Sequence, residues 1–343
     1  MPHIAPIVTP LARRTALPAM LRATFVAAFL AALVAGCGGK EPAEEQAAPP
    51  ARDPNAPLAV ANTGLATPES VLWDDTRRVW YVSNINGSPT AKDDNGYILR
   101  LGPGLARLDS LPFINGADDD ITLNAPKGLA LQGDTLWVAD IDMLRGFDVT
   151  TGTHVADVDL RRLRATFLND VAVGNDGAIY ITDSGIAFGA DGAVTHPGLS
   201  RVFEVRNRTP RQAVVLPRES AANGIVWHPA MNAWLIVGFN TPNIYSWVTG
   251  AKETTVAGTG PGGADGIVVL ADGSTLLTSW ADSSVTLFFG GLTTTMRRGL
   301  NAPADLGYDA RRGVIAVPLF SDDRVELWPV TSTPSATAAP LRP

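Results

Sequence analysis

Leu168-Asn169-Asp170-Val171 is one of six related stretches that decide the fold of this chain, because the same short phrase recurs at similar distances. Each copy starts with Pro, Ala or Leu, ends with Val, Leu or Ile, and in five copies has a polar second residue. The six copies are Pro68–Val71, Pro126–Leu129, Leu168–Val171, Ala222–Ile225, Ala264–Ile267 and Pro303–Leu306. Their spacings of 58, 42, 54, 42 and 39 residues lie in the range of propeller-type repeats.

A pattern of short strands follows each phrase. The phrase leads into an apolar strand, a tight turn and a second strand rich in β-branched and aromatic residues. The predicted second strands are Val79–Ser83, Leu136–Ala139, Ile179–Thr182, Trp234–Val237, Thr275–Ser279 and Val314–Val317. Third strands are predicted at Tyr97–Leu101, Arg201–Val205 and Arg324–Trp328. Helical periodicity over ten residues is not found in the domain. We therefore predict an all-β fold, a six-bladed β-propeller of four-stranded blades.

The last repeat ends after its third strand, so one strand is missing from the sixth blade. Leu58–Asn62, which precedes the first phrase, has the composition to supply it. We expect this N-terminal strand to close the ring, and we place the propeller at residues 58–330.

The N-terminal segment has the composition of a processing signal. Residues 23–36 are almost wholly apolar, and fourteen residues are too few to span a bilayer, as in a signal peptide. Val34-Ala35-Gly36-Cys37 resembles a bacterial lipobox, which predicts a signal peptide over residues 1–37 and lipidation of Cys37. Met20 is an alternative start to Met1. The expected location is the cell envelope, with the membrane reached only through the lipid. Gly38 favours the periplasmic face of the outer membrane if the source is Gram-negative.

Composition indicates the character of the segments that flank the propeller and the class of partner. Residues 38–57 are rich in Ala, Pro and Glu and predict a disordered tether, and residues 331–343 predict a similar flexible tail. The whole chain has a net charge of −7; after Cys37 it has 24 basic and 34 acidic residues, a net of −10. An acidic chain with no basic cluster excludes nucleic acid as a partner and favours cations.

The second residue of the phrase changes along the repeats from Glu69 through Lys127, Asn169 and Asn223 to Asp265, and is alanine in the last copy. Equivalent positions in a closed ring converge on its axis. Two carboxylates and two amide oxygens there form a site that suits Ca²⁺. The alternative is that Asn and Asp beside Gly serve turns, which does not explain a glutamate in the same position.

Three long segments are expected at the face on which the phrases begin. They are Ile85–Asn95, Pro112–Asn124 and Gly185–Gly198. Long loops are commonly kept for binding, so this face is the predicted functional one. The candidate substrate contacts are Asn84, Asp140, Asp142, Asp183, Asn240, Trp280 and Phe320. The last two have packing between blades as an alternative role.

With these residues in order, the chain resembles the regucalcin/gluconolactonase family, with diisopropylfluorophosphatase, paraoxonase and strictosidine synthase as distant relatives. The resemblance rests on Glu69 in Pro-Glu-Ser-Val, Asn169-Asp170, Asn223-Gly224 and Asp265-Gly266, and it spans residues 58–330. It implies a six-bladed propeller that holds a catalytic divalent cation, usually Ca²⁺, on Glu69, Asn169, Asn223 and Asp265. It also implies that Asp170 lies beside the metal and contacts substrate or water. The paraoxonase-type histidine is missing from these positions.

The predicted function is metal-dependent hydrolysis of a small-molecule lactone or related ester. Asp265 or Asp170 is the candidate base that activates water. Lys127 contacts a developing negative charge or an anionic substrate, or alternatively pairs with Glu69 or Asp305. The competing hypothesis is a non-catalytic ligand-binding or scaffold propeller with a structural Ca²⁺. The sequence does not identify the substrate or the oligomeric state.

Overall fold

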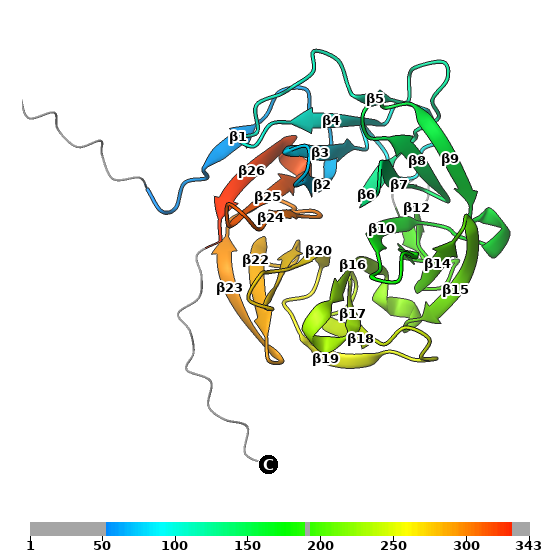
Figure 1. Ribbon diagram of the computed structural model, residues 1–343. Helices are drawn as coiled ribbons and strands as arrows, with labels where there is room; N and C mark the ends of the chain where they lie inside the picture. Colours follow the sequence, from blue (N-terminus) through cyan, green and yellow to red (C-terminus); the bar gives the residue numbers. More distant parts are fainter. Residues whose placement is uncertain (1–52, 189–192, 331–343) are drawn as a thin grey trace, which may run out of the picture. The chain divides into compact units, whose positions relative to one another are not determined.

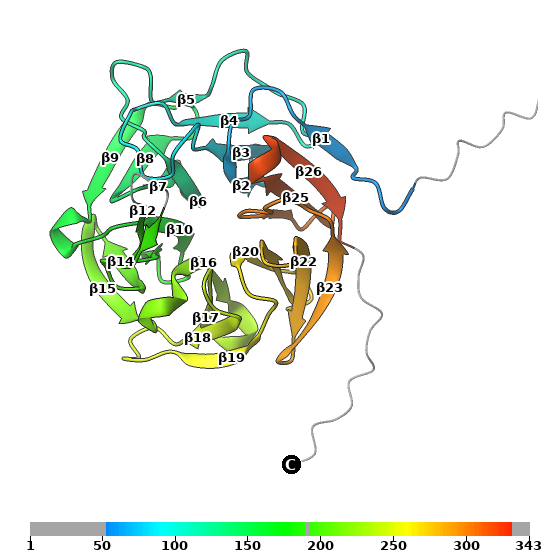
Figure 2. The same ribbon diagram turned by 180° about the vertical axis from the view of Figure 1, so that it is seen from behind.

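The computed structural model describes residues 53–188 and 193–330, and these residues form a β-propeller of six four-stranded antiparallel sheets (Figure 1). The six sheets are arranged around a central axis, and Figure 2 shows the same ring from behind. The predicted signal peptide, most of the tether and the C-terminal tail lie outside the described residues.

Each of the first five sheets is built from strands close in sequence. The first contains β2 (Pro68–Asp74), β3 (Val79–Asn84), β4 (Tyr97–Leu101) and β5 (Ile114–Asn115). The second contains β6 (Pro126–Gln132), β7 (Thr135–Asp140), β8 (Met143–Asp148) and β9 (His154–Asp159). The third contains β10 (Leu168–Val173), β11 (Ile179–Asp183), β14 (Arg201–Arg206) and β15 (Thr209–Val215). The fourth contains β16 (Ala222–His228), β17 (Ala233–Gly238), β18 (Asn243–Trp247) and β19 (Thr255–Thr259). The fifth contains β20 (Ala264–Val269), β21 (Thr275–Ser279), β22 (Ser284–Phe289) and β23 (Leu292–Arg298).

The sixth sheet combines strands from both ends of the described chain. Its order is β1 (Ala59–Ala61), β26 (Arg324–Pro329), β25 (Val314–Leu319) and β24 (Gly307–Asp309). The pairing of β1 with β26 is antiparallel and covers three residues, and Leu58 N donates to Leu327 O at 2.6 Å. The predicted strand Leu58–Asn62 is therefore present in a shorter form as the outer strand of this blade.

Apolar packing holds neighbouring blades together. Each pair of neighbouring sheets shares one buried hydrophobic cluster, and the six clusters follow one another around the ring. The cluster between the first and sixth blades contains Val71, Trp80 and Leu327, with Ala59 and Ala61 of β1 packed against it. The stability of the ring is therefore distributed over six similar interfaces. Each large apolar side chain that is fully buried there contributes ~1.5–3 kcal/mol to the free energy of folding.

The remaining elements are short. A two-stranded hairpin pairs β12 (Ala187–Phe188) with β13 (Val194–Thr195), between the second and third strands of the third blade. Within residues 53–188 and 193–330 the only helices are 3₁₀ turns, at Arg161–Leu163, Arg218–Ser220, Pro229–Met231 and Phe320–Asp322. Over the same described ranges, no helix has the length and apolar character needed to cross a membrane.

The predicted strands are confirmed, with small changes at their ends. Thr275–Ser279 and Tyr97–Leu101 match the structure, and the other second and third strands extend by one or two residues. The predicted tight turns lie between the first two strands of each blade. These agreements follow from the alternation of apolar residues and polar turns, which is a local signal.

Candidate functional site

The first strand of each blade lies nearest the axis, and in five blades it contains a register shift at the repeated phrase (Figure 1). In β10, for example, Leu168 pairs with Asp183 and Val171 with Ile181, so Asn169 and Asp170 fall within the irregularity. Such bulges turn side chains out of the ordinary pleat and are frequent near binding sites. Asn223 and Asp265 therefore lie in bulged strands and not in the tight turns considered from the sequence.

The phrase residues line a cavity of about 510 Å³ at the face that carries the long loops, here called the upper cavity. Glu69, Lys127, Asn169, Asn223 and Asp265 all contribute to its lining. All five side chains are at least nine-tenths buried. Two of the three predicted long loops, those after β3 and β11, also supply lining residues. The structure thus brings the predicted metal ligands together in one cavity.

The two carboxylates of the set are buried without full hydrogen bonding. Oε2 of Glu69 and Oδ1 of Asp265 have no hydrogen-bond partner among the described residues. Burial, followed by the charge of Asp265, raises the pKa of Glu69 well above its usual value. Burial and the charge of Asp305 likewise raise the pKa of Asp265, and the N–H groups of Trp280 and Asn223 act in the opposite direction. Unpaired buried oxygens of this kind are costly unless a cation or a ligand satisfies them.

The two asparagines complete the set with neutral oxygens. The amide nitrogen of Asn169 donates to Ser184 Oγ at 3.3 Å, which leaves its carbonyl oxygen available. Asn223 lies against Asp265. In the described part of the chain, no group of three or more His, Cys, Asp or Glu side chains could hold a metal ion. The predicted set contains only two such residues, Glu69 and Asp265, and its other two members are asparagines. Its chemistry, two carboxylates and two amide oxygens, is nevertheless that of a Ca²⁺ site, and the unpartnered oxygens fit this use.

Lys127 lies in the same ring of side chains, and its contacts differ from the ion pair considered above. Its ammonium donates to Pro89 O and to Ala125 O, at 3.0 Å in each case, and lies 4.4 Å from the ring centre of Phe167. Burial lowers the pKa of Lys127 to about 8, while the charges of Glu69 and Asp140 raise it. An ammonium has three donors, so one N–H remains for a ligand in the cavity.

Asp170 and Asp305 occupy a different position from the predicted metal ligands. Both line a second cavity of about 730 Å³, whose other walls come from the inner strands and from residues of the tight turns, here called the lower cavity. The oxygens of Asp170 accept from Val171 N and Ile225 N, each at 2.7 Å, and Asp305 accepts from Ser70 Oγ at 2.5 Å. Burial raises the pKa of both carboxyls, that of Asp305 to about 7. Asp170 thus ties the third blade to the fourth, and the structure places it outside the lining of the upper cavity.

Six of the seven predicted substrate contacts divide into two groups. Asn240, Trp280 and Phe320 line the upper cavity. Asn84, Asp140 and Asp183 are buried and accept backbone N–H groups that precede the first strand of the same blade. In the structure these three side chains therefore act as structural ties: each holds the segment that leads into the first strand of its blade.

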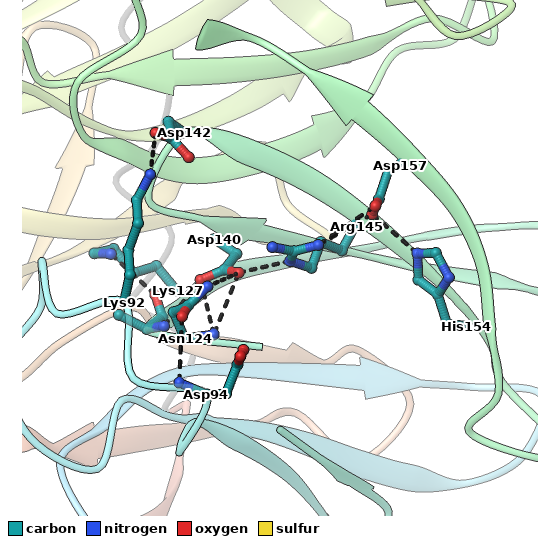
Figure 3. A network of polar contacts seen from close by, with 10 residues as sticks. Lys92, Asp94, Asn124, Lys127, Asp140, Asp142, Arg145, His154 and Asp157 are labelled. Carbon is teal, nitrogen blue, oxygen red and sulfur yellow. Dashed lines mark hydrogen bonds and ion pairs between the residues drawn. The ribbon is translucent and has the colours of Figure 1, made fainter. Parts of the chain in front are cut away.

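Asp140 shows how such a tie is built (Figure 3). It accepts from Asn124 N at 3.1 Å and from Ala125 N at 2.9 Å, and Arg145 Nε lies 2.6 Å from its other oxygen. Arg145 continues the network outward to Asp157, which also contacts His154. Because Ala125 O is a partner of Lys127, this network supports the position of the ammonium. Asp142, the remaining candidate, forms an ion pair with Lys92 in the same network.

Several cavity residues were not predicted from the sequence. The additional lining residues include Ile85, Phe167, Ser184, Ile186, Phe188, Val194, His196 and Phe239. His196 lies in the loop after β13, and its Nδ1 is buried without a partner among the described residues. Ile85, Ser184 and Phe239 come directly after the second strand of their blades, the place that Trp280 and Phe320 also occupy, so the repeat could have identified them. Ile186, Phe188, Val194 and His196 lie in the long loop of the third blade and follow no repeat.

The fold and the site together define a six-bladed propeller with a buried, oxygen-rich centre. No family model and no curated protein matches the chain in the comparisons. Among solved structures, a gluconolactonase from Xanthomonas campestris, described as important in glucose secondary metabolic pathways, shares the fold with a TM-score of 0.62. The two sequences are 16% identical, and the match covers 80% of this chain and 88% of the gluconolactonase. This likeness establishes the fold.

Proposed function

We propose that this protein is a hydrolase of a lactone or related ester that acts at the upper cavity and uses a divalent cation, most consistent with Ca²⁺. The observation that carries the proposal is the pair of unpartnered buried oxygens, on Glu69 and Asp265, beside two asparagines in one cavity. The gluconolactonase that shares the fold supports the reaction class. Glu69, Asn169, Asn223 and Asp265 would hold the cation, which when bound polarises a carbonyl group.

The protein's own groups would perform the remaining chemistry. Water attacks the acyl carbon, Asp265 accepts its proton, and the ester C–O bond breaks to give a carboxylic acid and a hydroxyl group. The proton passes from Asp265 to the leaving oxygen, so no other reactant is needed. Lys127, which has one donor left after its two backbone contacts, would bind the oxygen on which negative charge develops. In this proposal Asp170 is structural, because both of its oxygens accept backbone N–H groups.

We also propose that the protein acts at the cell envelope as a lipoprotein. Val34-Ala35-Gly36-Cys37 supports this location, as does the polar segment between Cys37 and the first strand. The lipid on Cys37 would be the only membrane attachment.

A panel of lactones and aryl esters tests the function. Purified protein should hydrolyse at least one class in Ca²⁺, and a chelator should abolish the reaction. Asp265→Asn should remove activity, whereas Asp282→Asn, in an acid that pairs with Arg298, should retain it. Calcium binding without hydrolysis of any member would support the alternative, a binding propeller with a structural ion.

A further inference from the structure

The upper cavity has walls of a different character from its floor. The buried polar groups Glu69, Asn169, Asn223, Asp265 and Lys127 lie together at the inner strands. The apolar lining residues are Ile85, Pro89, Phe167, Ile186, Phe188, Val194, Ala221, Phe239, Trp280 and Phe320. Such a cavity binds the reacting group at its floor and the rest of the molecule against hydrocarbon.

Aromatic side chains from several blades form these walls. Trp280 links Phe239 and Phe320, with ring centres 5.4 Å and 5.3 Å away. On another part of the wall, the ring centres of Phe167 and Phe188 lie 5.7 Å apart. Phe239 is 37% exposed and Val194 is 49% exposed, so apolar surface remains open at the cavity. A ligand that covers this surface gains ~25 cal/mol for each Å² of apolar area removed from water.

Polar groups that could bind several hydroxyl groups are scarce in the cavity. Ser184 Oγ donates to Ala222 O and accepts from Asn169, so its main hydrogen bonds are already made. Lys127 spends two of its three donors on backbone carbonyls. Outside the metal set, the other polar groups of the lining are Asn240, His196 and the indole N–H of Trp280, and a sugar lactone carries more hydroxyl groups than these three can pair. A polyhydroxylated lactone would bury hydroxyl groups without partners, which opposes binding.

We propose that the upper cavity selects lactones or esters that carry an apolar alkyl or aryl substituent, and that it discriminates against polyhydroxylated sugar lactones. The inference rests on the proposed hydrolase function, and it assigns the role of specificity determinant to the Phe239, Trp280 and Phe320 wall. It also distinguishes this chain from the gluconolactonase that shares its fold.

The test compares six-membered lactones that differ only in their substituents. With the full chain in Ca²⁺, kcat/KM should rise from δ-valerolactone to its alkyl-substituted derivatives by about fourfold for each CH₂ buried. Glucono-δ-lactone should be hydrolysed at least about tenfold less efficiently than the alkyl lactones. Phe239→Ser should reduce the preference for the alkyl chain, and Phe289→Ser, at a phenylalanine that is 62% exposed on β22, should leave it unchanged.

Binding of hydrolysis-resistant alkyl δ-lactams, measured by calorimetry, separates this inference from the function on which it rests. If the lactams bind with the same chain-length dependence, sensitive to Phe239→Ser, while no lactone is hydrolysed, the apolar selectivity stands and the hydrolase proposal fails. If lactones are hydrolysed but glucono-δ-lactone equals or exceeds the alkyl series, the inference is overturned and the hydrolase proposal stands. Equal effects of Phe239→Ser and Phe289→Ser would also overturn it.

Discussion

Replacing Glu69 by glutamine should stabilise the metal-free protein and remove most of the stability that calcium adds. In a chelator, Glu69 is buried near three other carboxylates, those of Asp265, Asp305 and Asp170, and its Oε2 has no partner among the described residues. Glutamine has nearly the same shape, carries no charge, and brings two N–H donors into a group of acceptors. We therefore expect the metal-free variant to be more stable than the metal-free wild type.

The magnitude follows from the one unsatisfied oxygen. Leaving a buried acceptor unpaired costs ~1–3 kcal/mol, and a domain of this size changes its melting temperature by about 2–4 °C for each kcal/mol. The variant should therefore melt roughly 2–12 °C above wild type in a chelator. At calcium concentrations 100-fold above Kd, wild type should gain about 2.7 kcal/mol, and the variant should gain little.

Thermal unfolding followed by circular dichroism, in chelator and in calcium, gives the four melting temperatures. Glu204→Gln is a matched control, because Glu204 is also buried but pairs with Arg206 and Arg211. This control should lower the melting temperature by similar amounts in both buffers. The reasoning is refuted if Glu69→Gln destabilises the protein in chelator, or if calcium stabilises wild type and variant equally.

Other consequences are independent of that measurement. Lys127→Met should tighten calcium binding measured by calorimetry, because it removes a positive charge beside the site; unchanged affinity would contradict this. Asp170→Asn should lower the melting temperature, because two backbone donors share that carboxylate, and calcium affinity should stay near wild type; weaker binding with unchanged stability would favour a role at the metal. Deleting residues 38–52 should leave the melting temperature nearly unchanged, whereas deleting 38–63 should lower it by exposing β26, and equal values would refute closure by β1. Mass spectrometry should show diacylglyceryl-modified Cys37 at the mature N-terminus, and an unmodified chain beginning elsewhere would contradict lipidation.

The repeated phrase predicted the fold because its signal is local and occurs six times. Apolar alternation and turn residues specify each strand, and the second phrase residue has an equivalent place in every blade. Glu69 and Asp265 are nearly 200 residues apart in the chain, yet repetition alone placed them in one ring, and both line the upper cavity.

The directions of neighbouring side chains within the phrase are less predictable, because a bulge decides which cavity each one faces. Asn169 and Asp170 are adjacent in sequence, but the first lines the upper cavity and the second the lower cavity. The register shift in β10 falls between Leu168 and Val171, so neither residue follows ordinary strand alternation. Without that geometry, sequence left Asp170 and Asp265 as equal candidates for the base.

Asn84, Asp140 and Asp183 are polar residues that recur at one place in successive blades, and the sequence alone favoured their interpretation as substrate contacts. Each is the last residue of the second strand in its blade and accepts an N–H group from the chain entering the first strand. A polar residue that recurs at one place in successive repeats, like these, is therefore more typical of a structural tie than of a substrate contact.

The apolar wall of the upper cavity, by contrast, combines repeating and non-repeating positions. Ile85, Phe239 and Trp280 each come directly after the second strand of their blade, as Phe320 does in the sixth blade. Phe188 and Val194 lie in the β12–β13 pair, which the other described blades lack. Repetition in this propeller thus determines where the polar groups and part of the wall lie, and the unequal loops add the rest of the wall.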